Sequence, residues 1–435
     1  MKTGWKRGRL PALMLALLLV LTGCTAGEKK PETQEPAAAF KPRMDGQTEC
    51  EVTVAGHYSN FEALEAEFNR FAEYYPKVQM NYTCLDDYNG VILTALDSSE
   101  PPDIFFTYPW MGTRKGYEAV YQTAENLADP ELGMDLSGIR ENLLTRDGEG
   151  RVPSVPVYIT TYGMLVNEDI FSREKIDIPV TYEGLIAACG ALQKAGYAHP
   201  VMAFNGSGFL LLPLYYPHLC AQLQGNEAAL ADLNAMKPGA GEPLRGSLAL
   251  AEDFMSRGFL SLEACSGLEN DYNAVIMRFF EGDVPMMLCS ANTVSGTEKR
   301  ESQSETFSAH PFRYSFHPVP STAEGGYFVN TVSMGFAVNS NSRNLEMANE
   351  FMRFLLSSGG LNRMARAKRM VTPCTAMSLD GIYAAFGRVD PGHVINLSEM
   401  GLADQADAQI KLAGWRVANG EMTAEEAAAS FGSIQ

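Results

Sequence analysis

Hydrophobic and polar positions follow two alternating periods in the first part of the chain. Residues 50–56, CEVTVAG, alternate with the period of a β-strand and end in glycine. Aromatic and leucine residues of 61–71 recur with helical spacing, and VQMNYT (78–83) alternates as a strand again. Residues 86–99 give a second helical pattern, and PPDIFFTYP (101–109) holds a third apolar run. Strand, helix, strand, helix and strand at this spacing predict a βαβ run on a parallel sheet.

Ligands of such sheets bind beyond the carboxyl ends of the strands. In this sequence those ends are Gly56-His57-Tyr58 and Thr107-Tyr108-Pro109-Trp110. Aromatic rings and a hydroxyl therefore gather at the edge where a ligand is expected.

The later part of the chain continues to alternate strands and helices. An apolar strand is predicted over 162–166, followed by a helix capped by Thr181. Residues 271–292 read as a helix, a glycine turn and a buried strand, and 325–358 as a glycine-rich loop, a strand and an amphipathic helix. No repeat of 20–50 residues is present, which excludes a solenoid. The length exceeds the roughly 250–300 residues at which one core stops growing, so two lobes are expected.

The first 23 residues have the pattern of an export signal. Four cations precede a twelve-residue apolar run, Leu10–Leu21, which is shorter than the roughly 20 residues a membrane span needs. The run ends in Leu21-Thr22-Gly23-Cys24, which resembles the bacterial lipobox, whose cysteine is lipidated and becomes the mature N-terminus. Residues 24–47 are rich in Pro, Ala and charge and predict a disordered tether behind lipidated Cys24.

Charge and cysteine content narrow the choice of function. The chain has 34 basic and 52 acidic residues; removal of the four signal cations leaves 30 against 52, a net charge of −22. So acidic a protein is a poor partner for nucleic acid, because phosphate contacts dominate that binding. Seven cysteines remain besides Cys24, with no CxxC pair, and we expect them to be free and mostly buried thiols. Cys50 and Cys84 would lie at opposite ends of neighbouring parallel strands, too far apart to bond.

Several ordered segments carry a resemblance to a known family. They are FNRFAEYYPKVQMNY, ALDSSEPPDIFF, YGMLVNEDIF, IPVTYEGLIAACGALQKAGY, FFEGDVPMML and FAVNSNSRNLEMANEFMRFLLSS, with GEMTAEEAAASF near the end. The chain resembles the lipoprotein solute-binding components of carbohydrate ABC importers. The resemblance covers almost all of residues 48–432. It implies an α/β fold of the periplasmic-binding-protein type, second topological class, with a central, mostly parallel sheet in each of two lobes.

The resemblance also implies how the chain is divided. The first lobe would comprise residues 48–157 and 325–374, and the second 158–324 and 375–435. The crossings would fall at Pro153–Val157, Ser321–Gly325 and Thr372–Thr375, short Pro- or Gly-containing or Thr-flanked segments suited to hinges. A ligand would bridge the two lobes in the cleft, and a membrane permease would recognise the closed, loaded form.

Sugars need aromatic rings for their C–H faces and polar side chains for their hydroxyl rims. The ligand-binding candidates are Tyr58, Thr107, Tyr108, Trp110, Thr161, Asn205, Asn292 and Tyr327. Trp110 is the best of them, since it directly follows the third strand and is one of two tryptophans outside the signal. Where many relatives carry Gly-Ser-Trp, this chain has Ser290-Ala291-Asn292, so a common stacking ring is missing. His57 is expected to be structural, and Trp415 to belong to the core.

The function expected is a monomeric, lipid-anchored, extracytoplasmic binder that captures a sugar or oligosaccharide for an ABC permease. It needs no cofactor or metal and performs no catalysis. Alternatives are a binder of a non-sugar solute, a ligand co-receptor for a sensor kinase, and a surface-anchored glycan hydrolase. No GxSxG or HExxH motif is present, although carboxylates are plentiful enough for a paired-acid glycosidase.

Overall fold

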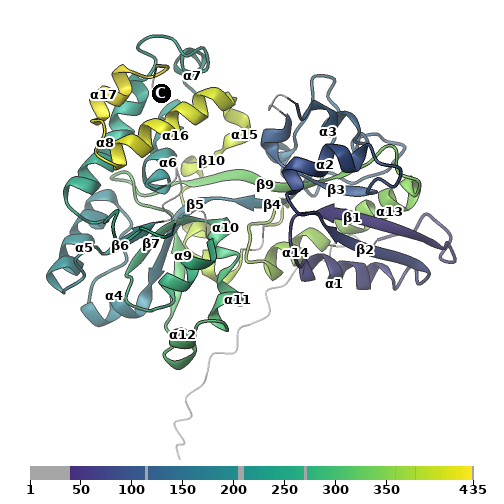
Figure 1. Ribbon diagram of the computed structural model, residues 1–435, viewed down its shortest axis with the longest axis horizontal. Coiled ribbons are helices and arrows are strands. Elements are labelled where there is room, and N and C mark those ends of the chain that lie inside the picture. Colours follow the sequence, from purple (N-terminus) through teal and green to yellow (C-terminus); the bar gives the residue numbers. More distant parts are fainter. Residues whose placement is uncertain are drawn as a thin grey trace, which may run out of the picture. The chain divides into compact units, whose positions relative to one another are not determined.

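The computed structural model describes residues 40–112, 116–203, 210–268, 272–357, 359–377 and 379–433. Within these ranges the strands form two separate sheets, one in each of two lobes (Figure 1). We call the first sheet with the helices that pack on it the first lobe, and the second sheet with its helices the second lobe. Among the helices described, none is long and apolar enough to cross a membrane.

The first sheet has the strand order β10-β9-β3-β1-β2, with β4 also paired to β9. Its strands are β1 (Cys50–Gly56), β2 (Val78–Cys84), β3 (Ile104–Thr107), β4 (Val155–Thr160), β9 (Phe328–Val338) and β10 (Val394–Asn396). Strand β1 pairs in parallel with both β2 and β3, which confirms the βαβ run predicted from the sequence. Strand β9 runs antiparallel to β3 and β4 and parallel to β10.

The second sheet has the order β6-β7-β5-β8. Its strands are β5 (Tyr162–Asn167), β6 (Val201–Ala203), β7 (Met286–Ser290) and β8 (Tyr314–His317). Strand β6 is parallel to β7, but β5 is antiparallel to both β7 and β8. The expected mostly parallel sheet is therefore correct for β1–β3 and wrong for this sheet. Strand β5 enters directly from the first lobe rather than through a crossover helix, so nothing forces it to be parallel.

Helices cover the faces of both sheets. In Figure 1, α1 and α14 lie on one side of the first sheet and α2 and α3 on the other. The first-lobe helices are α1 (Glu62–Phe71), α2 (Tyr88–Leu96), α3 (Glu118–Gln122), α13 (Leu345–Ser357) and α14 (Gly360–Ala367). The remaining helices are α4 (Glu168–Glu174), α5 (Tyr182–Lys194), α6 (Leu212–Leu223), α7 (Glu227–Asn234), α8 (Glu242–Ser256), α9 (Tyr272–Phe279), α10 (Ala291–Val294), α11 (Thr297–Glu301), α12 (Glu305–Ala309), α15 (Leu397–Met400), α16 (Asp404–Ala418) and α17 (Ala424–Ala429). Short 3₁₀ turns include η1 (Pro109–Gly112) and η2 (Glu141–Leu143).

Buried and exposed side chains alternate along β1 as the hydrophobic and polar residues of the sequence predict. On β1, Val52 and Val54 are fully buried while Glu51 is exposed. Leu64, Phe68 and Phe71 of α1 are buried, as their helical spacing predicts, and Phe68 and Phe71 pack on Phe351 of α13. The Thr181 hydroxyl accepts a hydrogen bond from the Gly184 N–H at 3.1 Å, which confirms it as the cap of α5.

The segment just before β1 packs against the first lobe. Phe40 is 7% exposed, and its ring meets the edges of Tyr74 and Phe354 with centroids 5.1 and 5.4 Å apart. The Arg43 N–H donates to buried Glu350 at 2.8 Å. Residues 40–44, included in the predicted tether, thus attach the start of the folded chain to α1 and α13.

The seven cysteines besides Cys24 are free. Four are buried, and Cys84 is exposed. In the β1–β2 pair, Cys50 lies opposite Val78 and Cys84 opposite Gly56, so the two thiols stand at opposite ends of the ladder. Both predictions about the thiols are confirmed.

Strands β3, β4 and β9 of the first sheet approach one another closely at Gly335. Gly335 pairs with Thr107 of β3 and with Pro156 of β4. A Cβ atom there would lie 2.5 Å from Ser154 Oγ and 2.8 Å from both Thr107 Oγ1 and the Val155 carbonyl oxygen. Only glycine lets these strands come this close.

We expect Gly335→Ala to destabilise the protein by about 1–3 kcal/mol, because the new methyl must displace backbone and buried hydroxyls. Gly246, inside α8, has nothing within 4 Å of its virtual Cβ and is the matched control. Gly246→Ala should stabilise by about 0.5–1 kcal/mol through helix propensity. Denaturant unfolding of both variants measures the difference; equal effects of the same sign would contradict the packing account.

Candidate functional site

Two aromatic segments meet where β1 and β3 end. His57 and Tyr58 follow β1, while Tyr108 and Trp110 follow β3. Because these strands are parallel neighbours, their carboxyl ends share one edge of the sheet. The Tyr108 hydroxyl and His57 Nδ1 share a hydrogen bond, and the two ring centroids are 5.8 Å apart. The structure therefore brings together the four aromatic residues that the strand ends predicted.

The rings form an ordered stack. Trp110 lies nearly parallel to Tyr108, with an interplanar angle of 4° and a centroid separation of 5.8 Å. The Tyr117 ring meets Trp110 edge-on at 4.9 Å. The Tyr121 hydroxyl donates to the Tyr108 carbonyl at 3.0 Å, which holds the turn η1 against α3. Such stacked and edge-on geometries are favourable for aromatic pairs and limit the motion of the indole.

The rings of His57, Tyr108 and Trp110, which we call the aromatic wall, form one side of a hollow of about 680 Å³. Its other walls come from the end of β2 and the start of α2, and its lining residues are His57, Leu85, Asp86, Asp87, Tyr88, Asn89, Tyr108 and Trp110. Asp87 has a φ of +50°, in the left-handed region that L-residues seldom adopt. Backbone strain of this kind concentrates at ligand sites and must be supported by the surrounding structure. The hollow thus combines aromatic faces with an amide and two carboxylates at its rim.

The rings of the aromatic wall are uncharged at pH 7. Desolvation lowers the pKa of His57 from 6.5 to about 4, so its imidazole is neutral at pH 7. Desolvation also raises the pKa of Tyr58 and of Tyr121 to about 12, and that of Tyr108 further. A neutral wall that can stack and hydrogen-bond suits an uncharged, hydroxylated ligand.

Polar residues of the second lobe reach the first lobe near the middle of β9. Asn292 lies on α10, directly after β7, and its Oδ1 accepts a hydrogen bond of 2.9 Å from the Ser333 hydroxyl of β9. Both side chains of this pair are at the surface. Thr161 is the single residue between β4 and β5; it is fully buried, and its carbonyl accepts from the Ala291 N–H at 2.9 Å. Asn292 and Thr161 therefore lie where the two lobes meet.

Other predicted ligand residues lie elsewhere. Thr107 is buried, shares a hydrogen bond with Ser154, and does not line the aromatic hollow. Tyr327 is 9% exposed and packs on His393, with ring centroids 4.6 Å apart. Asn205 and the lipidation candidate Cys24 lie outside the described residues.

Tyr58 is placed beside the hollow rather than in its lining. Its ring centroid is 4.2 Å from that of His57 and 5.0 Å from that of Phe61. The Lys368 ammonium lies over the ring at 5.4 Å from the centroid. Tyr58 therefore supports His57 from behind and is largely enclosed by its neighbours.

Sequence reasoning missed Asp86, Asp87, Ser333 and Lys368. The two aspartates follow β2, the other parallel neighbour of β1, so the rule used for β1 and β3 would have found them. Ser333 lies where β9 shifts register against β4, between the pairings of Tyr158 and Ile159. No local pattern predicts such a shift.

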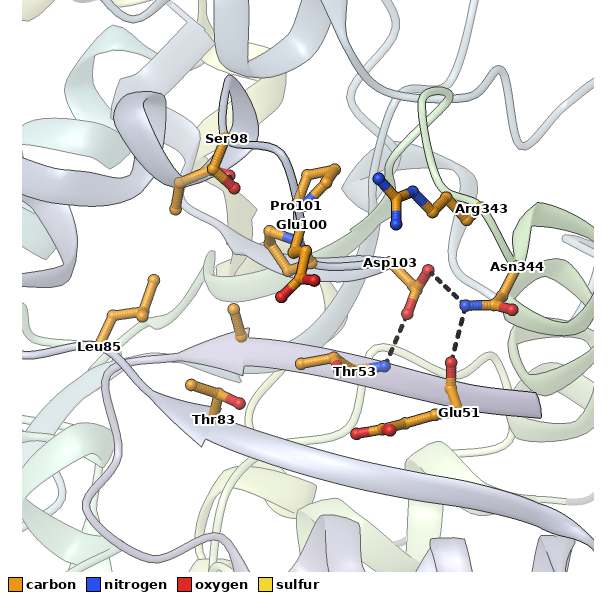
Figure 2. A pocket seen from close by; sticks show the side chains of 13 residues that line it. Glu51, Thr53, Thr83, Leu85, Ser98, Glu100, Pro101, Asp103, Arg343 and Asn344 are labelled. Carbon is orange, nitrogen blue, oxygen red and sulfur yellow. Dashed lines mark hydrogen bonds between the residues drawn. The ribbon is translucent and has the colours of Figure 1, made fainter.

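A second hollow of the first lobe, of about 440 Å³, differs in character (Figure 2). Asp103 accepts from the Thr53 N–H at 2.7 Å, and the Asn344 amide donates to the Glu51 carbonyl at 2.7 Å. These polar groups already hold the loops before β3 and α13 to β1. None of its lining residues is aromatic, so it lacks a face on which a sugar ring could stack.

The described ranges contain no group of three or more His, Cys, Asp or Glu side chains that could hold a metal ion. Asp86 and Asp87 line the aromatic hollow, and an ionised carboxylate accepts hydrogen bonds.

Comparison with known proteins identifies the family. The family of bacterial extracellular solute-binding proteins matches residues 55–361. The chain belongs to this family. Its members are binding proteins, which confirms the expectation that this solute-binding protein is a receptor and not an enzyme. No curated protein matches the chain in sequence.

Solved structures of similar fold agree with this assignment. RafE from Streptococcus pneumoniae, in its apo form, has a TM-score of 0.68 and 15% identity, covering 88% of this chain and 97% of its own. The GacH receptor of Streptomyces glaucescens, solved unliganded and with acarbose, has a TM-score of 0.65 and 17% identity over 89% and 97%. A sugar transporter from Bacillus licheniformis in complex with stachyose has a TM-score of 0.61 and 16% identity over 89% and 100%. At these identities the likeness confirms the two-lobe α/β fold.

The neutral state of His57 can be checked by an NMR titration of the imidazole C–H signals. We expect the His57 pKa near 4 in the folded chain, so stability associated with this group falls as the pH drops from about 6.5 towards 4. Tyr108→Ala should raise this pKa towards 6.5, because the His57 ring, which is already exposed at the surface, then loses a neighbouring ring that desolvates it. His317, whose pKa burial also lowers to about 4, belongs to the second sheet and should not move. A His57 pKa that stays near 4 in the variant would contradict shielding by Tyr108.

Proposed function

We propose that this solute-binding protein captures a sugar or oligosaccharide between its two lobes and delivers it to an ABC permease. In this proposal the chain acts as a monomer on the outer face of the cell membrane, anchored by lipid on Cys24. The lobes follow the boundaries expected from the sequence, 48–157 with 325–374 and 158–324 with 375–435, except that Tyr158–Thr160 and β10 (Val394–Asn396) pair in the first sheet and so belong to the first lobe. The ligand is a small carbohydrate, and no cofactor takes part.

The observation that carries the proposal is the neutral aromatic wall at the ends of β1 and β3. Trp110 and Tyr108 are stacked with a 4° interplanar angle and flank a hollow of about 680 Å³. A hollow of this volume is in the usual size range of small-molecule sites, roughly 300–1,000 Å³. Aromatic rings match the C–H faces of a sugar, and the Asp86, Asp87 and Asn89 side chains supply acceptors and a donor for hydroxyls.

The ligands of similar solved structures agree in chemical class. RafE has been solved with raffinose, GacH with acarbose, and the Bacillus licheniformis transporter with stachyose. Each of these ligands carries several hydroxyl groups on linked rings. Their shared chemistry supports a glycan in the present cleft.

Capture would work by closure of the lobes on the ligand. The Ser333–Asn292 hydrogen bond and the single linking residue Thr161 lie between the lobes, while Trp110 belongs to the first lobe alone. A ligand on Trp110 that also reaches the second lobe would favour the closed state. The shift in population equals the preference of the ligand for that state and no more.

Thermal melting of the full chain in detergent against mono- and oligosaccharides tests the proposal, with amino acids, polyamines and phosphorylated solutes as non-sugar controls. A sugar at 100 times its dissociation constant should stabilise the protein by about 2.7 kcal/mol. Trp110→Ala should raise the dissociation constant of that sugar by about tenfold or more, because the stacking face is lost.

Trp415→Phe is the matched control, since Trp415 is partly buried on α16 in the second lobe and should not touch the ligand. Stabilisation by a non-sugar solute alone would overturn the carbohydrate assignment and leave the solute-binding family intact. Equal loss of sugar binding in both tryptophan variants would contradict the site.

A further inference from the structure

Two consecutive residues after α14 send their side chains to different lobes. Helix α14 packs on α1, α13 and β4 of the first lobe. Lys368 points back to that lobe, while Arg369 reaches α11 and β8, which belong to the second. Neighbouring residues of the chain thus contact different lobes.

Lys368 contacts the rings that lie directly behind the aromatic wall. Its ammonium lies 5.4 Å from the centroid of Tyr58 and 5.7 Å from that of Phe61, a cation–π geometry. Tyr58 in turn packs on His57, which lines the aromatic hollow. A movement of Lys368 would therefore shift Tyr58, and through Tyr58 it would shift His57 in the lining of the hollow.

The guanidinium of Arg369 contacts four side chains of the second lobe. Its Nη1 donates to Glu301 Oε1 at 2.9 Å, to Thr297 Oγ1 at 3.0 Å and to the Tyr314 hydroxyl at 2.8 Å. Its Nε lies 3.8 Å from Glu298 Oε2. The side chains of Arg369 and Glu301 are 21% and 29% exposed, so water and dissolved salt still reach this ion pair.

The backbone at Arg369 is held in an unusual conformation. Its φ is +46°, in the left-handed region where a long side chain is uncommon. The Tyr383 hydroxyl donates to the Arg369 carbonyl at 2.7 Å, and the Ile159 N–H donates to the Val371 carbonyl at 2.9 Å. These bonds tie the strained residue to the second lobe on one side and to β4 on the other. Such strain persists only where the surroundings enforce it.

We propose that Arg369 is a positioning residue that pins the third interlobe crossing and sets the angle between the lobes. Its guanidinium fixes the crossing to α11, and Lys368 carries that position to Tyr58 and the aromatic wall. The link to ligand capture rests on the proposed function, whereas the effect on lobe geometry needs no ligand.

The test compares Arg369→Asn with the unchanged full chain in detergent. Asparagine tolerates left-handed backbone, so this variant removes the guanidinium and keeps the fold. Distances are measured by double electron–electron resonance between spin labels on genetically encoded residues at Lys77 and Lys194, exposed positions on the first and second lobes. Without ligand, Arg369→Asn should broaden the distance distribution. One molar salt should broaden that of the unchanged chain and have little further effect on the variant.

Arg313→Gln is the control, because Arg313 pairs with Asp169 at 2.9 Å within the second lobe and is 70% exposed. It should leave the distribution unchanged, and Arg369→Lys should restore it in part. Identical distributions for Arg369→Asn and the unchanged chain would overturn the proposal, even if the melting temperature falls. If a sugar is found to bind, its dissociation constant should change by about fivefold or more in Arg369→Asn. Absence of any sugar binding to the unchanged chain would instead count against the proposed function alone.

Discussion

One residue separates the two sheets of this protein. Strand β4 ends at Thr160 in the first sheet, and β5 begins at Tyr162 in the second. Thr161 between them is fully buried, and its carbonyl is bonded to the N–H of Ala291. So short a passage leaves the lobes no freedom to separate at this point. Relative motion must occur as rotation about the crossing, which is how hinged binding proteins close.

The position of the aromatic wall depends on the same constraint. Parallel pairing of β1 with β2 and β3 delivers all three strand ends to one edge of the first sheet. The close approach at Gly335 then fixes β3 against β4 and β9, the strands that lead into the second lobe. Trp110 is thereby held at a set position relative to the crossing. A stacking surface of this kind can favour closure only if it does not yield when the ligand arrives.

The aromatic wall is neutral although the protein that carries it is acidic. The chain as a whole is acidic, with 52 carboxylate residues against 34 basic ones, yet the rings around His57 are neutral at pH 7. Asp86 and Asp87 add acceptors at the rim without entering the stack. This division between an apolar face and a polar rim resembles the division within a sugar itself. It also explains why the second hollow, rich in polar groups and without aromatic rings, is a weaker candidate.

Local patterns were sufficient to predict strands β1 to β3 of the first sheet and the aromatic residues at their ends. The strands β1, β2 and β3 and the buried face of α1 follow from alternation and helical spacing, and His57, Tyr58, Tyr108 and Trp110 follow from the positions of the strand ends. Pairings distant in the sequence were not predictable in this way. The antiparallel neighbours of β5 and the addition of β10 to β9 depend on how the chain returns between lobes.

The same limit applies to individual contacts. Phe40 lies in a polar, proline-rich stretch, and its ring packs on Tyr74 and Phe354. Because Phe354 is more than 300 residues further along the chain, no local pattern predicts this contact. In the sequence, Arg369 and Lys368 look like ordinary charged residues at the end of a helix. Their division between the lobes appears only when α14, α11 and β8 are placed in space.

Quenching of Trp110 fluorescence by acrylamide tests the central claim most directly. In the full chain carrying Trp5→Phe and Trp415→Phe, Trp110 is the one remaining indole. A sugar that stabilises the protein should cover Trp110 and lower its quenching constant, with a shift in its emission maximum. A sugar that binds with no change in either property would show that the ligand lies elsewhere, and would contradict the account of the aromatic wall.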